Sequence, residues 1–122
     1  MLREIRNVKQ ERGAGRRRWF ESDGLDLIVW LNRSGGRTGF QVCYDFGKGE
    51  HALTWRPVGG FVHHRVDAGD TSPLKNESPI LVHAGAVPWV KLRKIFGERS
   101  ETLEPELREW VEAALGEGAA AR

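Results

Sequence analysis

The sequence predicts an α+β fold: an antiparallel β-meander of five to six strands, with one or two C-terminal helices packed on one face. Three observations support this prediction. Between residues 16 and 67, runs of β-branched and aromatic residues alternate with short Gly-rich turns, as in consecutive antiparallel strands. Pro88 and Pro105 each stand at the start of a helical pattern, where a missing N–H costs nothing. The 122 residues are enough for a single domain, residues 1–122, with one hydrophobic core.

The first fifteen residues fit two patterns. Leu2, Ile5 and Val8 recur at every third position, which suits a helix, whereas the alternation within residues 5–10 suits a strand equally well. We favour an extra strand, or an arm, over residues 1–15. Gly13-Ala14-Gly15 would then lead into the next strand.

The meander itself is predicted from its turns. Asp23-Gly24 lies between two apolar runs and indicates a short hairpin of type I′, which needs positive φ at both central residues. Further turns are expected at residues 33–37, 47–49 and 57–60. The predicted strands are residues 16–22, 25–32, 38–46, 50–56 and 61–67.

Side-chain alternation predicts the register. A two-residue turn at Gly47-Lys48 pairs Val42 with Leu53 and Phe40 with Trp55, whereas a one-residue slip would misplace the apolar set. The same parity assigns further side chains to this core face: Leu27, Val29, Leu31, Tyr44, Phe46, Val62, His64 and Val66. The second face would carry Ile28, Trp30, Gln41, Cys43, Ala52, Thr54, His63 and Arg65.

The C-terminal third is expected to supply the second layer. Residues 68–79 are rich in turn-forming residues and indicate a surface loop, followed by a short strand at 80–83. Helices are expected at about 88–96 and 104–115, ended by Gly97 and Gly116, with a frayed tail at 117–122. One apolar stripe of the second helix consists of Leu103, Leu107, Trp110, Val111 and Leu115.

Composition excludes several classes of protein. The formal charge is only +2, which is too small to indicate nucleic-acid binding by itself. Cys43 is the single cysteine, so an intrachain disulfide is excluded and a reducing compartment is favoured. The N-terminus resembles no signal peptide, and the longest apolar run is too short to cross a membrane. We therefore expect a cytoplasmic protein.

Four acidic residues are predicted to be neighbours on the second face: Asp26, Asp45, Glu50 and Asp67. Such a row of like charges needs cations or wide solvation. A divalent metal, ion pairs with basic residues (Arg65, Lys91, Arg93, Lys94 or residues 16–18) and plain solvation are the alternatives. We favour ion pairing or solvation and predict no metal site and no cofactor, because the sequence lacks the spacing of a Ca²⁺-binding loop.

Other reactive residue types also lack a catalytic pattern. His63 and His64 are adjacent, so in a strand they point to opposite faces and cannot bind one ion together. Cys43 has apolar predicted neighbours and is expected to be an inert buried thiol. No catalytic residue is predicted, and the sequence leans towards a protein that is not an enzyme.

Two candidate binding sites remain. The first is a polar pocket for a small ligand on the second face, made of Gln41, Asp45, Thr54, Arg56, His63 and Arg65. The second is a basic N-terminal arm, in which arginines next to an aromatic residue could bind single-stranded nucleic acid. Its residues are Arg16, Arg17, Arg18 and Trp19.

Six segments carry a resemblance: RRWF (17–20), DGLDLIVWL (23–31), GFQVCYD (39–45), HALTWR (51–56), HHRVD (63–67) and PILV (79–82). Together they resemble a group of short uncharacterised bacterial proteins over about residues 17–82. The resemblance implies a bacterial cytoplasm and no particular activity. We expect a non-catalytic binding or assembly module, for which a homodimer is one form. The alternatives are a small-ligand-binding protein or enzyme that uses the polar pocket, and a weak single-stranded nucleic-acid binder, although we do not expect nucleic acid or a membrane as partner.

Overall fold

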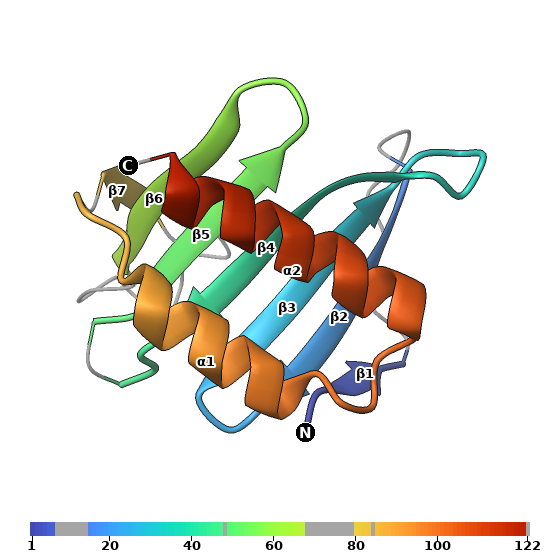
Figure 1. The fold of residues 1–122 in the computed structure, drawn as a ribbon, viewed down its shortest axis with the longest axis horizontal. Coiled ribbons are helices and arrows are strands. Elements are labelled where there is room, and N and C mark those ends of the chain that lie inside the picture. The colour runs from blue at the N-terminus through green and yellow to red at the C-terminus, as the bar shows by residue number, and fades with distance from the viewer. Residues whose placement is uncertain (7–14, 48, 68–79, 84, 122) are drawn as a thin grey trace, which may run out of the picture.

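The structure is a computed structural model that describes residues 1–6, 15–47, 49–67, 80–83 and 85–121. The predictions for residues 7–14 and for the 68–79 loop lie outside these residues. Seven antiparallel strands form one sheet in chain order, so the predicted meander of five to six strands gains a strand (Figure 1). They are β1 (Arg3–Ile5), β2 (Arg16–Ser22), β3 (Leu25–Leu31), β4 (Arg37–Tyr44), β5 (His51–Arg56), β6 (Gly60–Asp67) and β7 (Ile80–His83).

The predicted register is confirmed between β4 and β5, and the predicted core face is confirmed for β3. Val42 pairs with both Leu27 and Leu53, and Phe40 pairs with both Val29 and Trp55. These registers bring the apolar residues of three strands onto one face, as the period of two requires. Apolar alternation was therefore enough to align β4 with β5 and to assign the faces of β3, whereas β3 and β4 pair two residues away from the expected neighbours: Cys43 lies opposite Asp26 and not Ile28.

The predicted register between β5 and β6 is wrong. Leu53 pairs with His63, and Arg56 pairs with Gly60, so the connecting loop has three residues instead of the predicted four. A slip of one residue moves every side chain of a strand to the opposite face. His63 therefore lies on the core face and is 6% exposed, whereas Val62 lies on the second face and is 42% exposed.

Two turns differ from the prediction in their backbone. Asp23 and Gly24 form the predicted two-residue turn, but only Gly24 has positive φ, so the turn is not type I′. The register across the β4–β5 hairpin is as predicted, yet β4 ends at Tyr44 and β5 begins at His51, so both strands are shorter than predicted. Asp45 has a φ of 59°, and Phe46, which was assigned to the core face, is 37% exposed.

Two helices follow the sheet, α1 (Trp89–Arg99) and α2 (Pro105–Ala120). Both continue beyond the glycine that was expected to end them. A glycine inside a helix costs only about 1 kcal/mol relative to alanine, which tertiary packing can outweigh. Packing at the end of α2 is close: a Cβ built on Gly118 would meet Trp89 Cη2 at 2.3 Å and Phe61 Cε2 at 2.7 Å. The predicted frayed tail is therefore helical up to Ala120.

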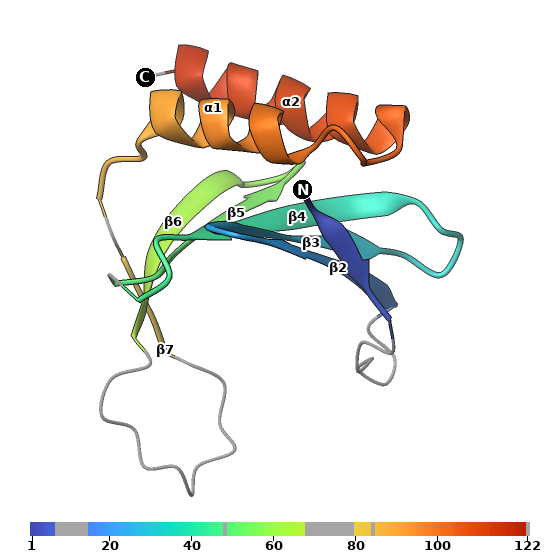
Figure 2. The same ribbon diagram turned by 90° about the horizontal axis from the view of Figure 1, so that it is seen from below.

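The helices lie side by side and cover one face of the sheet, as predicted (Figures 1 and 2). The core lies between these two layers. Its members from the sheet include Leu25, Leu27, Val29, Phe40, Val42, Tyr44 and Leu53, and those from the helices include Trp89, Leu92, Phe96, Leu107, Val111 and Leu115. The predicted stripe of α2 thus packs on the predicted core face of the meander. No helix among the described residues is long and apolar enough to cross a membrane.

Candidate functional site

The face of the sheet opposite the helices is the largest candidate site. We call it the open face, because no described helix or strand packs on it (Figure 2). The sheet curves so that this face is on the inner side of the curve. Strand register assigns to it Arg17, Trp19, Glu21, Asp26, Ile28, Trp30, Gln41, Cys43, Ala52, Thr54, Arg56, Val62, His64 and Val66, and Glu50 precedes β5 with the same parity.

The centre of the open face is apolar and only partly exposed. Ile28 is 8% exposed and Ala52 is fully buried, although no described element covers either residue. Trp19 lies opposite Ile28 and is itself half-buried. A sheet face that is simply solvated usually carries polar side chains at such positions.

Polar side chains on this face bond chiefly to one another. The indole N–H of Trp19 donates to Asp26 Oδ2 at 3.2 Å. Thr54 Oγ1 donates to Gln41 Oε1 at 3.4 Å, and Gln41 Nε2 donates to Cys43 Sγ at 3.3 Å. Burial raises the pKa of the Cys43 thiol to about 11, so the thiol is protonated and unreactive at neutral pH.

Charges are segregated along the strands. One end of the sheet, where β2 and β4 begin and β5 ends, carries five arginines: Arg16, Arg17, Arg33, Arg37 and Arg56. The other end, at the β2–β3 and β4–β5 turns, carries Glu21, Asp23, Asp26, Asp45 and Glu50. The sheet therefore has a basic end and an acidic end. Residues that are close in sequence, such as Arg17 and Glu21, lie at opposite ends, whereas Arg16 and Arg56 lie at the same end.

The arginines of the open face lie against its tryptophans. The guanidinium of Arg56 lies 4.7 Å from the ring centroid of Trp30, and that of Arg17 lies 5.9 Å from the ring of Trp19. Gly39 lies between Trp30 and Arg56, and a Cβ there would meet the carbonyl oxygen of Trp55 at 2.7 Å. The missing side chain lets Arg56 reach across the strand to the indole.

Two carboxylates at the acidic end are partly desolvated. Burial raises the pKa of Asp26, while the hydrogen bond from Trp19 opposes that shift. Burial also raises the pKa of Glu50, and the negative charge of Asp26 adds to it. Among the described residues, neither carboxylate has an ion-pair partner. Both would gain from a cation supplied from outside the chain.

The predicted row of four acidic residues is only partly present. Asp26 and Glu50 do lie near each other, since the negative charge of Asp26 raises the pKa of Glu50. Asp45 belongs instead to the helix side, where its Oδ1 is 2.6 Å from Lys91 Nζ of α1. Its positive φ ends the alternation of β4 and turns the side chain away from the predicted face. The side chain of Asp67 lies outside what the structure describes.

A second polar cluster lies between the sheet and the start of α1. Tyr44, His51 and His63 stack their rings there, and the hydroxyl of Tyr44 bonds to His63 Nε2. His63 Nδ1 is 3.0 Å from the carbonyl oxygen of Gly85, which can only accept, so Nδ1 carries the proton and Nε2 accepts from Tyr44. Burial, followed by the charge of Asp45, raises the pKa of Tyr44 to about 12.

This cluster holds the fold together, and two of its three side chains are buried, whereas that of His51 is 26% exposed with its Nδ1 3.9 Å from Asp45 Oδ2. Tyr44 is 1% exposed and His63 is 6% exposed, so neither can meet a substrate without rearrangement. Their bonds join β4, β6 and the segment that leads into α1. Among the described residues, no group of three or more His, Cys, Asp or Glu side chains could hold a metal ion.

The predicted ligand-binding residues are divided between the two faces. Gln41, Thr54 and Arg56 lie on the open face, as predicted. His63 and Arg65 lie on the helix side because of the shorter β5–β6 loop. Since Asp45 also faces the helices, the predicted single pocket does not form among these six residues.

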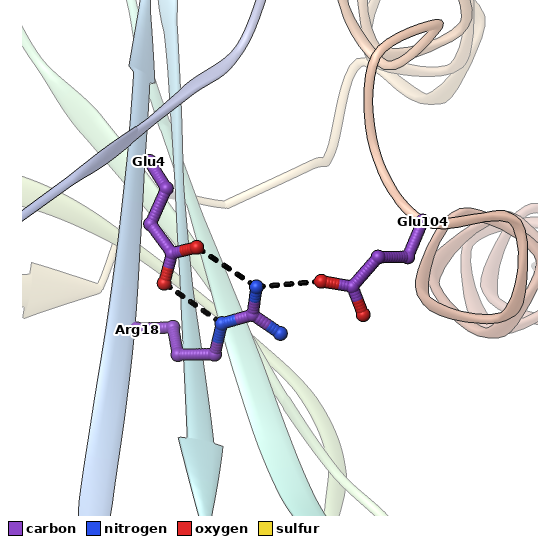
Figure 3. Close-up of polar contacts among 3 residues, drawn as sticks. All are labelled: Glu4, Arg18 and Glu104. Atoms are coloured by element: carbon purple, nitrogen blue, oxygen red, sulfur yellow. Dashed lines mark hydrogen bonds and ion pairs between the residues drawn. The ribbon is translucent and has the colours of Figure 1, made fainter.

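The predicted nucleic-acid-binding arm is divided as well. Arg18 lies between two carboxylates, with its Nε and Nη2 2.8 Å from Glu4 and its Nη2 2.6 Å from Glu104 (Figure 3). These bonds lower the pKa of both glutamates. Arg18 therefore joins β1, β2 and the start of α2, while Arg16, Arg17 and Trp19 remain at the basic end or on the open face.

Comparisons with family models, curated proteins and solved structures found no match. The resemblance to short bacterial proteins therefore stays a prediction. Sequence reasoning missed the gathering of arginines at one end of the sheet. The available signal was the antiparallel strand order itself, which brings the start of one strand beside the end of the next.

Proposed function

We propose that this protein is a non-catalytic assembly module that forms a homodimer through its open face. One observation carries the proposal. On that face, Arg56 at one end of β5 and Glu50 at the other both lack an ion-pair partner among the described residues. A second copy that meets this face in the opposite direction would pair both charges.

A two-fold axis gives this arrangement directly. If the axis lies across the strands near Leu53, which is midway between residues 50 and 56, Arg56 of each copy faces Glu50 of the other. Such an interface is isologous and closed, because the same contact occurs twice. The partly buried carboxylate of Glu50 would then gain the cation that its own chain does not supply.

The apolar centre of the open face supports the same proposal. Trp19, Ile28, Gln41, Thr54 and Val62 form one row across the sheet, between its basic and acidic ends, and the row is aromatic or aliphatic on both sides of its polar middle. Protein interfaces typically have an apolar, aromatic centre surrounded by a polar rim. This row would lie at the centre of the dimer, with Trp19, Ile28 and Val62 supplying its apolar surface and the arginine–glutamate pairs around it.

Charge exchange tests the dimer. Light scattering after gel filtration, at micromolar protein, is expected to give twice the monomer mass for the wild type. Arg56→Glu and Glu50→Arg alone should each give monomers. An equimolar mixture of these two variants should give dimers, because every contact again joins opposite charges. The double variant Arg56→Glu/Glu50→Arg should dimerise for the same reason.

Arg65→Glu is the matched control. Arg65 is an exposed arginine of the neighbouring strand but lies on the helix side, so the variant should remain dimeric. A monomeric wild type would refute the proposal. Dimers of Arg56→Glu, or a mixture of single variants that stays monomeric, would refute the assigned interface.

A small-ligand site has less support, because its predicted residues do not converge.

A further inference from the structure

Three arginines from three successive elements, β2, the β3–β4 turn and β4, lie at one corner of the basic end. We call Arg16, Arg33 and Arg37 the arginine corner. Arg16 and Arg37 both pair with Leu31, from its two sides, and Arg33 stands in the turn that follows Leu31. All three side chains are exposed. Their convergence results from the strand order and has no counterpart in sequence spacing.

The turn that carries Arg33 is held by four hydrogen bonds. The backbone N–H of Asn32 donates to the carbonyl of Gly36 at 2.8 Å, and the N–H of Gly35 donates to the carbonyl of Asn32 at 3.0 Å. The side chain of Asn32 accepts from Ser34 and Gly36, both at 2.9 Å. A turn fixed in this way loses little conformational entropy when its arginine binds a ligand.

Arg37 is oriented by an aromatic ring. Its guanidinium lies 5.0 Å from the ring centroid of Trp110 in α2. A guanidinium that lies against a tryptophan offers its other surface as a flat, charged plane. Nucleic-acid bases stack on such planes as well as on aromatic rings.

The three arginines of the corner lack the carboxylate partners that several other arginines of the chain have. Arg18 is paired with two glutamates, and Arg3 and Arg108 each have one. Among the described residues, Arg16, Arg33 and Arg37 have no ion pair. The charge of Arg37 lowers the pKa of Glu104 and that of Arg16 lowers the pKa of Glu4, but both carboxylates are hydrogen-bonded to Arg18. The corner therefore carries positive charge that the described structure does not neutralise.

We propose that the arginine corner binds single-stranded nucleic acid. Arg16 and Arg33 contact successive phosphates, and Arg37 with Trp110 stacks on an unpaired base. Phosphate contacts supply affinity without sequence preference, and stacking requires a base that is free of a duplex. The proposal is independent of the dimer, because none of these residues belongs to the open face.

Fluorescence anisotropy of a labelled oligothymidylate tests this proposal. Two phosphate contacts predict a salt slope of about −1.4, so the affinity should fall about 7-fold between about 50 and 200 mM salt. Arg33→Ala and Arg16→Ala should each weaken binding several-fold and reduce that slope by about 0.7. Arg37→Ala should weaken binding with less change in the slope, since its stacking is lost as well.

Arg65→Ala is the control, because it removes an exposed arginine far from the corner and should leave binding unchanged. Circular dichroism of each variant checks that the fold is intact. The absence of binding to wild type, or equal weakening by Arg65→Ala, would overturn the proposal. Equal affinity for a duplex of the same length would overturn the role of stacking. Glu50→Arg, which is designed to be monomeric, should bind as well as wild type and thereby separates this proposal from the dimer.

Discussion

Substitution of Gly118 by alanine measures how closely the end of α2 packs on the sheet. An alanine Cβ would lie 2.3 Å from Trp89 Cη2 and 2.7 Å from Phe61 Cε2, distances that force the rings or the helix to move. Overpacking of this kind costs about 1–3 kcal/mol. Alanine also gains about 1 kcal/mol of helix propensity over glycine, and less near a helix end. The net expectation is a loss of about 0–2 kcal/mol.

Gly116→Ala and Gly97→Ala are matched controls in the same two helices. A Cβ at Gly116 would meet only Arg93 Nη2, at 3.6 Å, and one at Gly97 would meet nothing within 4 Å. Both variants should therefore stabilise the protein by up to about 1 kcal/mol. Urea unfolding at one fixed protein concentration measures all three variants. If Gly118→Ala were as stabilising as Gly116→Ala, the close contact of α2 with Phe61 and Trp89 would be refuted.

Three further predictions concern polar groups. Arg18→Ala should cost about 0.5–1 kcal/mol at neutral pH. Because Arg18 lowers the pKa of Glu4, this contribution exists above the unfolded pKa of Glu4 and is lost as the pH falls through its lower folded value. The difference between wild type and variant in urea unfolding should therefore shrink in acid, and a difference that grew would contradict the pairing. Cys43 should react with a thiol reagent at pH 8 far more slowly in the folded protein than in urea, and rapid reaction would show an exposed thiol. Tyr44→Phe should lower the free energy of unfolding by about 1–3 kcal/mol, because it removes the hydroxyl that bonds to the buried His63 Nε2. Tyr44 is the only tyrosine in the chain, and absorbance titration should show no ionisation of it until about pH 12.

The centre of the fold could be predicted from the sequence because two requirements coincide there. Val42 and Leu53 must share the core face, and the hairpin between them has only one register that allows it. The β5–β6 hairpin lacks this constraint, since adjacent Gly59 and Gly60 both adopt positive φ and suit loops of either length. Phe61 carried the missing signal. As the largest apolar residue of β6, it packs beside Trp55 on the core face, where the predicted register did not put it.

The binding surfaces were harder to predict, because they depend on partners distant in sequence. Arg17 and Arg18 are adjacent and chemically identical, yet alternation sends one to the open face and the other to Glu104, which is 86 residues away. Arg33 lies in a turn and Arg37 begins β4, within a segment whose composition suggested only turn formation. Their relation to Arg16 follows from strand pairing, so it becomes visible only once the sheet is assembled.

The position of the N-terminus has a consequence for the order of folding. Leu2 is 3% exposed, its backbone N–H donates to the carbonyl of Arg99 at 2.8 Å, and its carbonyl accepts from Thr102 Oγ1 at 2.9 Å. All of these partners are synthesised about a hundred residues later, and contacts of such high separation form late. On the ribosome, the central hairpins can pair as they emerge, whereas the first strand must wait for the helices. Residues 2–5 are therefore expected to reach their native contacts after the central hairpins, although they are made before them.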